Sequence, residues 1–484
     1  MDCKRTFFSS FAWKFSERLL SQGIGLVIQI MIARMIAPAA VGETAILLSV
    51  INVFSVIAQS GFSSYIIQKK NLTDEVISSV ITFSVFIALG CIGVFVLSGN
   101  YIMSYLGYPH LGIYLKVAGV MLLFHAINGV LMGLLSKGMQ FKEMFLRTLV
   151  VLPLSAFVCF LLMFYGMDLE ALIAYNIVNP FFTTVFLVKL IQSSEYNIRF
   201  RISSNEVKAA LPYSIRVLTQ DIGNVVCNSV RSFVVGGIYN ANNLAYYDRA
   251  FTYTSYVEES VTYTASSVLL PALAREQDNQ EKFNRYIVKS TALYSLIVVP
   301  ALLGFAAVSP TFTKLILTEK WMPCVPYMCV FAVGFLHYPI LTIQRPAFLA
   351  CGRSDVTLKI TIVQNIIGVL AVFVTLKISP LAIAIGTSIS LLTLIPLYTY
   401  ATRKYFGIAY VLQLGPMLKY IVLATVMAFC IAPLNEISAN ELSKILMQVV
   451  IGCVVYTVLL ITTKDKYFLG IVNMVKERIS KHNE

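Results

Sequence analysis

The feature that most constrains this chain is a succession of apolar runs, each about twenty residues long, that recur from the N-terminus to residue 463. A helix of that length crosses roughly 30 Å of hydrocarbon and satisfies its own backbone hydrogen bonds. Membrane-spanning β-strands would need segments of about ten residues in strict alternation, which these runs lack. The sequence therefore predicts an all-α polytopic membrane protein with about fourteen transmembrane helices. The predicted spans are residues 12–35, 41–67, 75–98, 111–136, 144–166, 169–192, 209–237, 244–270, 286–309, 324–350, 356–377, 380–401, 417–435 and 444–463.

Lys and Arg gather in alternate connecting segments of this predicted chain. With the N-terminus in the cytoplasm, most of them fall on the cytoplasmic side, as the positive-inside rule requires. We therefore expect both termini in the cytoplasm. We interpret the net charge of +13 as anchoring to the headgroups of membrane lipids, with no nucleic-acid partner. The basic clusters are Lys69 with Lys70, Lys137 with Lys142, Arg199 with Arg201, Arg275 with Lys282 and Arg285, Arg403 with Lys404, and the tail from Lys464 to Lys481.

The sequence also lacks the features of several function classes. Its connecting segments are too short for a nucleotide-binding or glycosyltransferase domain, and no phosphate-binding loop motif occurs. The four histidines are far apart and the nine cysteines are scattered, so we expect no metal site, no cofactor and no disulfide framework. The first apolar stretch lacks a cleavage site and is expected to remain as a helix. The function must then sit within the helices, and we expect it not to be enzymatic.

Two pairs of segments indicate an internal duplication. Residues 18–25 read RLLSQGIG and residues 216–223 read RVLTQDIG, while residues 62–67 and 265–270 match more weakly at nearly the same spacing. A repeat of six helices relates two lobes by a pseudo-two-fold axis along the membrane normal and places a substrate cavity between them. The predicted domains are a six-helix lobe at 1–192, a cytoplasmic linker at 193–208, a second six-helix lobe at 209–401, and two further transmembrane helices with a basic cytoplasmic tail at 402–484.

Four predicted helices carry polar side chains that would line this cavity. The first and seventh helices each have a polar arc, in which Arg216 is the repeat mate of Arg18. The eighth interleaves Tyr and Arg at helical spacing, and the tenth has a cation between Pro339 and Pro346. The candidate substrate-binding residues are Lys14, Arg18, Gln22, Arg216, Gln220, Asn224, Arg231, Arg249, Tyr253, Tyr256 and Arg345.

Cations inside a membrane need an explanation, because a charge in hydrocarbon costs at least about 2.5 to 3.5 kcal/mol. We interpret the set as the lining of an electropositive cavity for an anionic ligand, since guanidinium groups bind phosphate in a bidentate manner and tyrosine rings stack on sugars. For any single cation, an internal salt bridge is an equally good interpretation. The carboxylates Glu17, Asp221 and Glu259 are the candidates for coupling transport to an ion gradient.

Several short motifs resemble those of the Wzx-type polysaccharide flippases, in particular the WzxC-like colanic acid exporter branch of the multidrug/oligosaccharidyl-lipid/polysaccharide exporter superfamily. They are ARMIAPAAVG at 33–42, LSKGMQFK at 135–142, PALAR at 271–275, EKWMP at 319–323 and ACGR at 350–353. This sequence departs from the family pattern where Val41 replaces an aromatic residue, Ile36 replaces Leu and Thr318 replaces Gly. These departures bear on the subfamily more than on the family.

The resemblance implies two six-helix lobes with alternating access. It also implies export of an undecaprenyl-pyrophosphate-linked oligosaccharide repeat unit across the bacterial inner membrane, for an O-antigen, a capsule or a colanic-acid-like exopolysaccharide. A polysaccharide polymerase and a chain-length regulator would be partners. The alternative on the same fold is a cation-coupled multidrug exporter, which would favour an acidic cavity. A membrane-embedded glycan polymerase would need a large extracytoplasmic loop, and a scaffold protein would leave the charged stripes unexplained.

Overall fold

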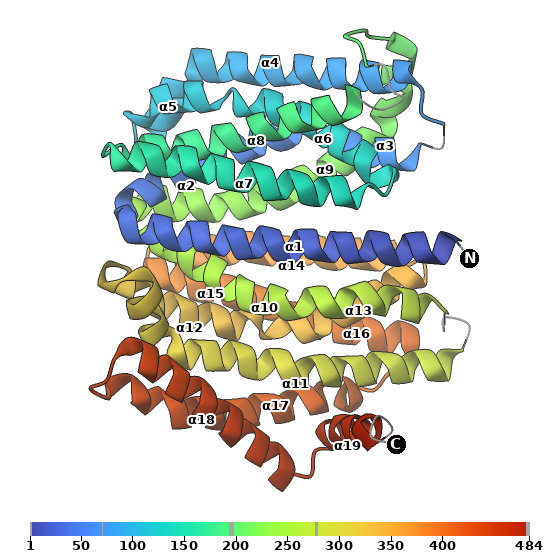
Figure 1. Cartoon of the computed structure of the whole chain (residues 1–484), viewed down its shortest axis with the longest axis vertical. Helices are drawn as coiled ribbons and strands as arrows, with labels where there is room; N and C mark the ends of the chain where they lie inside the picture. Colours follow the sequence, from blue (N-terminus) through green and yellow to red (C-terminus); the bar gives the residue numbers. More distant parts are fainter. Residues whose placement is uncertain (1, 70, 193–197, 276–278, 481–484) are drawn as a thin grey trace. The chain divides into compact units, whose positions relative to one another are not determined.

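The computed structural model describes residues 2–69, 71–192, 198–275 and 279–480, and every regular element within them is helical (Figure 1). Twelve helical segments of the described chain are long and apolar enough to cross a membrane. They correspond to twelve of the fourteen predicted spans, and the prediction of an all-α polytopic membrane protein is confirmed. The other two predicted spans fall on α9 and α10, long helices with more polar side chains, so the count of fourteen stays a prediction.

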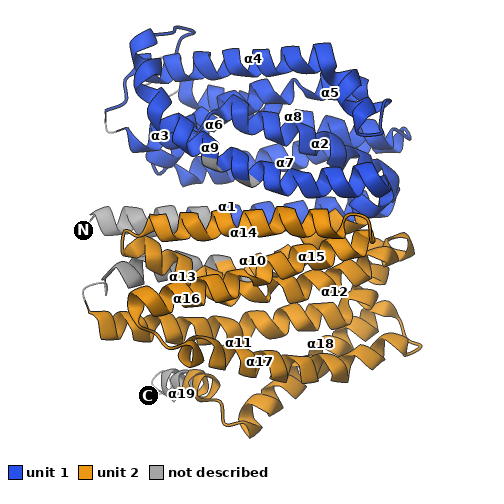
Figure 2. Ribbon diagram, turned by 180° about the vertical axis from the view of Figure 1, so that it is seen from behind, with its two compact units in different colours: residues 1–245 blue, residues 246–484 orange. Residues whose placement is uncertain are grey.

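The chain divides into two compact units, Met1–Ala245 and Tyr246–Glu484 (Figure 2). In unit 1, α1 packs along α7, α7 packs on α8, and α9 packs on α2, α3 and α4. A core beneath α3 and α9 joins Phe62, Ile77, Leu131 and Leu187. The elements of unit 1 are α1 Asp2–Met35, α2 Pro38–Gln59, α3 Phe62–Gln68, α4 Asp74–Tyr105, α5 Leu111–Ala118, α6 Met121–Lys137, α7 Phe141–Phe164, α8 Asp168–Gln192, α9 Ser204–Val234 and the π-helix η1 Val235–Tyr239.

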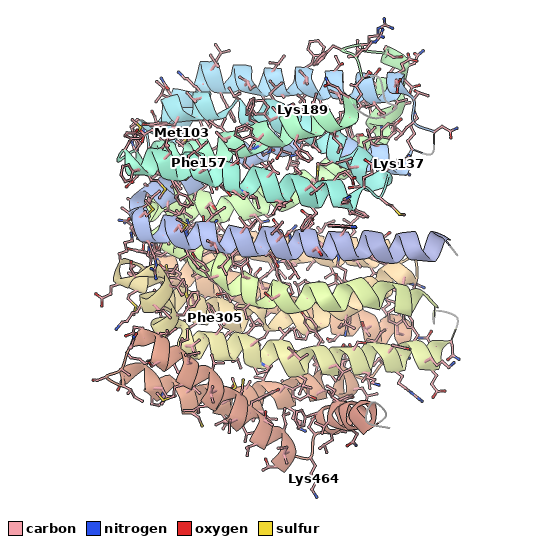
Figure 3. All side chains as sticks on the ribbon, viewed as in Figure 1. Met103, Lys137, Phe157, Lys189, Phe305 and Lys464 are labelled. Carbon is pink, nitrogen blue, oxygen red and sulfur yellow. The ribbon has the colours of Figure 1, made fainter. Side chains whose placement is uncertain are left out.

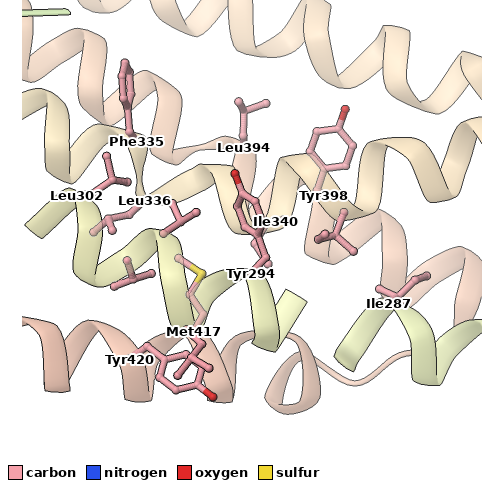
Figure 4. Packing of buried hydrophobic residues seen from close by; sticks show 14 of the residues in the cluster. Ile287, Tyr294, Leu302, Phe335, Leu336, Ile340, Leu394, Tyr398, Met417 and Tyr420 are labelled. Carbon is pink, nitrogen blue, oxygen red and sulfur yellow. The ribbon is translucent and has the colours of Figure 1, made fainter. Parts of the chain in front are cut away.

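Unit 2 is built around α11, which packs along α17 and also contacts α12, α13 and α18. Tyr294 and Leu302 of α11 meet Ile340 of α13 and Met417 of α17 in one apolar cluster (Figure 4). The helix α10, Ala241–Arg275, begins in unit 1 and continues into unit 2. The remaining elements are α11 Gln280–Phe312, η2 Thr313–Leu317, η3 Glu319–Cys324, α12 Val325–Gly334, η4 Phe335–His337, α13 Tyr338–Ala350, α14 Ser354–Thr375, α15 Pro380–Leu392, α16 Leu394–Phe406, α17 Tyr410–Ile431, η5 Ala432–Glu436, α18 Glu441–Thr462 and α19 Lys466–Ser480.

Several predicted spans are each divided by a turn into two helices. Between α2 and α3, Ser60 and Gly61 both have positive φ, and a Cβ at Gly61 would lie 2.8 Å from the Ser214 carbonyl of α9. Glycine is therefore required at this turn, because it permits both the left-handed conformation and the close approach. Between α12 and α13 the helix tightens into a 3-10 turn at Phe335–His337, and Pro339 stands in the first turn of α13.

Two features of the fold differ from the sequence-based picture. The division between compact units falls after Ala245, because α9 packs on α2, α3 and α4, whereas the predicted second lobe begins at residue 209. How the chain divides into lobes during transport stays a prediction. The basic tail after the last predicted span contains a further helix, α19, whose Phe468 and Ile471 pack against the core of unit 2.

Candidate functional site

The first candidate residues lie on α1, where Glu17 is buried at 8 % exposure. Its carboxylate lies 3.5 Å from the guanidinium of Arg147, and the Thr148 hydroxyl donates a hydrogen bond to it at 3.3 Å. Both partners come from α7. Glu17 therefore ties α1 to α7 through an ion pair, which is the structural interpretation that the sequence left open for such a residue.

The rest of the polar arc of α1 borders open space. Arg18 and Gln22 are half-buried. A Cβ placed on Gly25, two turns beyond Arg18 on the same face, would meet no atom within 4 Å, so the backbone next to these side chains is not covered by another element. This leaves room for a ligand beside the middle of α1. The side chain of Lys14 lies outside the described residues.

The helix α9 is fixed on one side to unit 1. Ser214 and Ser229 are buried there, and the Ser229 hydroxyl donates to the Ser49 carbonyl of α2 at 3.4 Å. The close approach of α9 to Gly61 lies on this same side. Small side chains thus let α9 pack tightly on α2 and α3.

Another face of α9 is exposed and carries a charge. Arg216 is exposed on it, and Gly223, two turns beyond Arg216, faces open space. Ile215 and Val226 are exposed on the same face, and Asp221 is exposed on a different one. A charged, open helix face is expensive against hydrocarbon and inexpensive against water or an anionic ligand. The side chains of the two other candidates on this helix, Gln220 and Asn224, lie outside the described residues.

The C-terminal end of α9 has an unusual backbone. Arg231 is half-buried and donates to the side-chain oxygen of Asn228, and α9 then passes into the π-helix η1. The carbonyl of Gly236 in η1 accepts a hydrogen bond from the Tyr108 hydroxyl at 2.8 Å. A Cβ on Gly236 would lie 2.7 Å from the Ile46 side chain. Short π-helical segments recur at functional sites. Tyr108, which bonds this segment, is not among the sequence-based candidates.

In unit 2, two predicted lining residues of α10 are buried among aromatic rings. Arg249 is 8 % exposed, and its guanidinium lies 5.9 Å from the ring centroid of Trp321. Tyr253 is 2 % exposed and stands edge-on to Phe312 at 5.8 Å. The Nε of Arg249 is buried without a hydrogen-bond partner, and Arg249 has no carboxylate partner among the described residues. Its charge is held by an aromatic face, a cation–π arrangement.

Five residues beyond Tyr253, α10 buries a carboxylate that is not among the sequence-based candidates. Glu258 is 1 % exposed. It accepts a hydrogen bond from the Tyr294 hydroxyl of α11 at 3.1 Å and another from Thr262. Hydroxyl groups donate to a carboxylate and accept from a carboxylic acid, so this cluster accommodates Glu258 in either protonation state. The neighbouring candidates Tyr256 and Glu259 are half-buried.

The last candidate cation, Arg345, is exposed on α13. The adjacent Gln344 is fully buried, where its amide donates to Gln413 at 2.9 Å and its carbonyl accepts from Thr402 at 2.7 Å. This network holds α13 against α16 and α17. Of the two polar residues between Pro339 and Pro346, Gln344 is therefore a buried packing contact, whereas Arg345 is exposed.

The described candidates differ in their surroundings. In unit 1, Arg216 and Asp221 are exposed and Arg18, Gln22 and Arg231 are half-buried. In unit 2, Arg249 and Tyr253 are buried, Tyr256 and Glu259 are half-buried, and Arg345 is exposed. Glu17 is engaged in an ion pair. No group of three or more His, Cys, Asp or Glu side chains in this part of the chain is placed to hold a metal ion.

Helices of membrane-crossing length, with polar faces on α1 and α9, define a polytopic membrane protein of the transporter class. A family model described as "Polysaccharide biosynthesis protein" matches residues 31–326, and the chain belongs to this family. The chain is 20 % identical to the succinoglycan biosynthesis transport protein ExoT of Rhizobium meliloti (strain 1021), over 96 % of this chain and 95 % of that protein. It is 22 % identical to the lipopolysaccharide biosynthesis protein WzxC of Escherichia coli (strain K12), over 81 % and 79 %.

Solved structures share the fold. The chain superimposes on the lipid II flippase MurJ in its inward closed conformation with a TM-score of 0.78 and 15 % identity, over 94 % of this chain and 99 % of that one. An inward-facing MATE family multidrug transporter matches with a TM-score of 0.63 and 15 % identity, over 81 % and 98 %. The resemblance to Wzx-type flippases of this superfamily is confirmed by the family match and the curated relatives.

Proposed function

We propose that this chain is a flippase that carries a lipid-linked oligosaccharide across the membrane for the biosynthesis of a surface polysaccharide. The observation that carries the proposal is the exposed charge of Arg216 on one face of α9, a helix that otherwise packs within a membrane bundle. Such a face requires water or an anionic ligand. The family and the curated relatives support a polysaccharide precursor as that ligand.

The substrate would be an undecaprenyl-pyrophosphate-linked repeat unit. Arg216 of α9 and Arg18 of α1 would contact the pyrophosphate, since guanidinium groups match phosphate oxygens in charge and geometry. The open backbone at Gly25 and Gly223 would leave room for sugar rings beside them. The polyprenyl tail needs no polar contact and would stay in lipid. Flipping of this kind breaks and forms no covalent bond.

The chain would lie in the bacterial inner membrane with both termini in the cytoplasm. Within unit 1, Lys137 marks the end of α6, while Met103 of α4 lies at the opposite end (Figure 3). Basic residues likewise mark the ends of α16 and α18, with Arg403, Lys404 and Lys464. The positive-inside rule would assign the basic end of each unit to the cytoplasm. A polymerase and a chain-length regulator would receive the product on the other side.

A flipping assay in reconstituted vesicles tests the proposal. The wild-type chain is expected to expose an undecaprenyl-pyrophosphate-linked oligosaccharide to an external glycan-modifying enzyme, while a cationic drug is not transported. Arg18→Ala and Arg216→Ala should each slow flipping about ten- to a hundredfold, the range for a lost hydrogen bond to a charged group. In cells, the same variants should reduce surface polymer at normal protein levels.

Lys377→Ala is the matched control, because Lys377 is an exposed cation in the segment between α14 and α15. It should flip at the wild-type rate. Wild-type flipping by both arginine variants would remove α1 and α9 from the site. Transport of the drug without flipping of the lipid would instead establish the multidrug exporter.

A further inference from the structure

A cavity of about 550 Å³ opens at one end of unit 2. None of the candidate substrate-binding residues lines it. Its walls come from the first turns of α11, the segment between α16 and α17, and the start of α19. Three cations, Arg285, Lys289 and Lys466, line it together with apolar side chains such as Val288 and Leu412. A cationic rim over an apolar wall is the chemistry of a site for an amphiphile.

Hydrogen bonds fix the walls of this cavity. The Asn284 amide of α11 donates to the Phe406 carbonyl at the end of α16 at 2.8 Å, which joins two walls. The start of α19 is held by Asp465, which is 3 % exposed and accepts from the Lys419 ammonium at 2.6 Å. Asp465 also accepts from the backbone N–H groups of Tyr467 and Phe468 at 3.1 and 3.0 Å. Lys466 and Tyr467 are thereby presented to the cavity.

The cavity carries an excess of positive charge. Its one carboxylate, Glu281, pairs with Arg285 at 3.0 Å. Three cations against this single carboxylate leave a net charge of about two positives. A second cavity, in unit 1, differs in this respect, because Asp74 and Glu75 there balance Arg199 and Arg201. The cavity of unit 2 is therefore suited to an anion.

The position of the cavity indicates the source of that anion. Two membrane-crossing segments, Gln280–Leu317 and Tyr410–Glu436, begin at its walls. It therefore lies at a membrane surface, where basic pockets between helices bind phospholipid headgroups. We propose that it binds the phosphodiester headgroup of an anionic phospholipid, with the glycerol and the upper acyl chains against Val288 and Leu412. The apolar wall favours a lipid over soluble phosphate, because phosphate has no apolar group that could pack against it.

The bound lipid would link α19 to the bundle at the membrane surface, since Lys466 belongs to that helix and Arg285 and Lys289 belong to α11. This role is independent of the transported substrate. It makes the protein selective for the composition of the surrounding leaflet, whatever glycan it moves.

Native mass spectrometry of the full-length protein tests this site, with phosphatidylglycerol and phosphatidylcholine of identical acyl chains as probes. Wild-type protein should retain phosphatidylglycerol and not phosphatidylcholine. Affinity should fall about fivefold for Lys289→Gln and on the order of a hundredfold for the triple variant Arg285→Gln, Lys289→Gln, Lys466→Gln. The control is Lys142→Gln, Lys208→Gln, Lys359→Gln, which removes as many exposed cations from the starts of α7, α9 and α14.

A second variant, Leu412→Glu, keeps all three cations and adds an anion to the exposed wall, and it too should lose phosphatidylglycerol. Equal retention by the two triple variants would overturn the proposal. So would displacement of phosphatidylglycerol by an equal concentration of inorganic phosphate, because the site would then recognise soluble phosphate. A flippase-inactive chain that still retains the lipid would leave this inference intact.

Discussion

Gly42, in the second turn of α2, lies against the backbone of Ala241 at the start of α10. A Cβ at this position would collide with the Ala241 carbonyl. The neighbouring Val41, where the resemblance implies an aromatic residue, is buried. The glycine of the ARMIAPAAVG motif thus has a steric reason: only hydrogen fits where the two helices meet.

We predict that Gly42→Ala destabilises the protein by about 1 to 3 kcal/mol, because overpacking at a backbone contact outweighs the better helix propensity of alanine. Thermal unfolding in detergent, followed by tryptophan fluorescence, should show a lower midpoint. The control is Gly90→Ala in α4, where an added Cβ meets nothing within 4 Å and a small gain of about 0.5 to 1 kcal/mol is expected. Equal midpoints for the two variants would contradict the steric account.

Single-residue patterns predicted some placements and not others. The sequence predicted a helix in this region, and the structure has α9 over Ser204–Val234 with Arg216 exposed. That its polar residues line a substrate cavity stays a prediction. The burial of Arg249 against Trp321 was not predictable, since it depends on how η3 folds back onto α10. The same limit applies to Glu258, whose partner Tyr294 lies on the next helix.

The helix α19 was not predicted from the sequence. The sequence suggested a basic tail, but Asp465 caps the first turn of α19, and the residue before it, Lys464, has a positive φ that reverses the chain. Phe468 and Ile471 then face the core of unit 2. A run of basic residues masked this short amphipathic pattern.

The pKa of Asp465 lies below its ordinary value: burial acts to raise it, but hydrogen bonds from Lys419 and the Phe468 N–H outweigh that effect. A lowered folded-state pKa contributes stability above the unfolded value of about 3.9, and this contribution is lost as the pH falls below it. We therefore expect α19 to remain docked at neutral pH and to loosen only below about pH 4.

Hydrogen–deuterium exchange of residues 466–480 measures this docking. Asp465→Asn should accelerate exchange about ten- to a hundredfold at neutral pH and abolish the acid transition. Asp355→Asn is the control, because Asp355 is exposed and lies 3.9 Å from an exposed Lys359, a pair worth at most about 1 kcal/mol. An unchanged exchange rate in Asp465→Asn would exclude the cap as the anchor of α19.

The sequence did not predict where helices are interrupted. Apolar run length set the spans, but it carries no information on the turns at Gly61 or at Phe335–His337. The first depends on the approach of α9, and the second on Gly334, where a Cβ would lie 2.6 Å from the Ser388 hydroxyl of α15. Contacts between distant segments decide such breaks.

For the whole molecule, hydropathy predicted the class of fold because the bilayer imposes it on every span alike. The short motifs added the resemblance to Wzx-type flippases, which the family match and the curated relatives confirm. The packing of α9 on α2, α3 and α4 was not visible in the duplication, since a repeat describes ancestry and not the contacts that each copy makes. Coupling of transport to an ion gradient through a carboxylate stays a prediction. A suitable carboxylate would be buried and would have no cationic partner.

We propose that Glu258 is that carboxylate and that protons drive the flippase. Glu17 is held by Arg147, whereas Glu258 is buried with hydroxyl partners from Tyr294 and Thr262. Among the described residues, Glu259 and Tyr338 are further titratable groups near it. Since hydroxyl partners tolerate either protonation state, a change of access to Glu258 would load or release a proton without breaking a salt bridge.

In reconstituted vesicles, an imposed pH difference should accelerate flipping by the wild-type chain, and Glu258→Gln should remove the acceleration entirely, because the amide cannot exchange a proton near neutral pH. Glu319→Gln, which alters an exposed carboxylate between η2 and α12, should keep the wild-type response. If a pH difference accelerates flipping by Glu258→Gln as much as by the wild-type chain, Glu258 is excluded. Asp221 and Glu259, which the sequence analysis named, then remain the candidates for ion coupling.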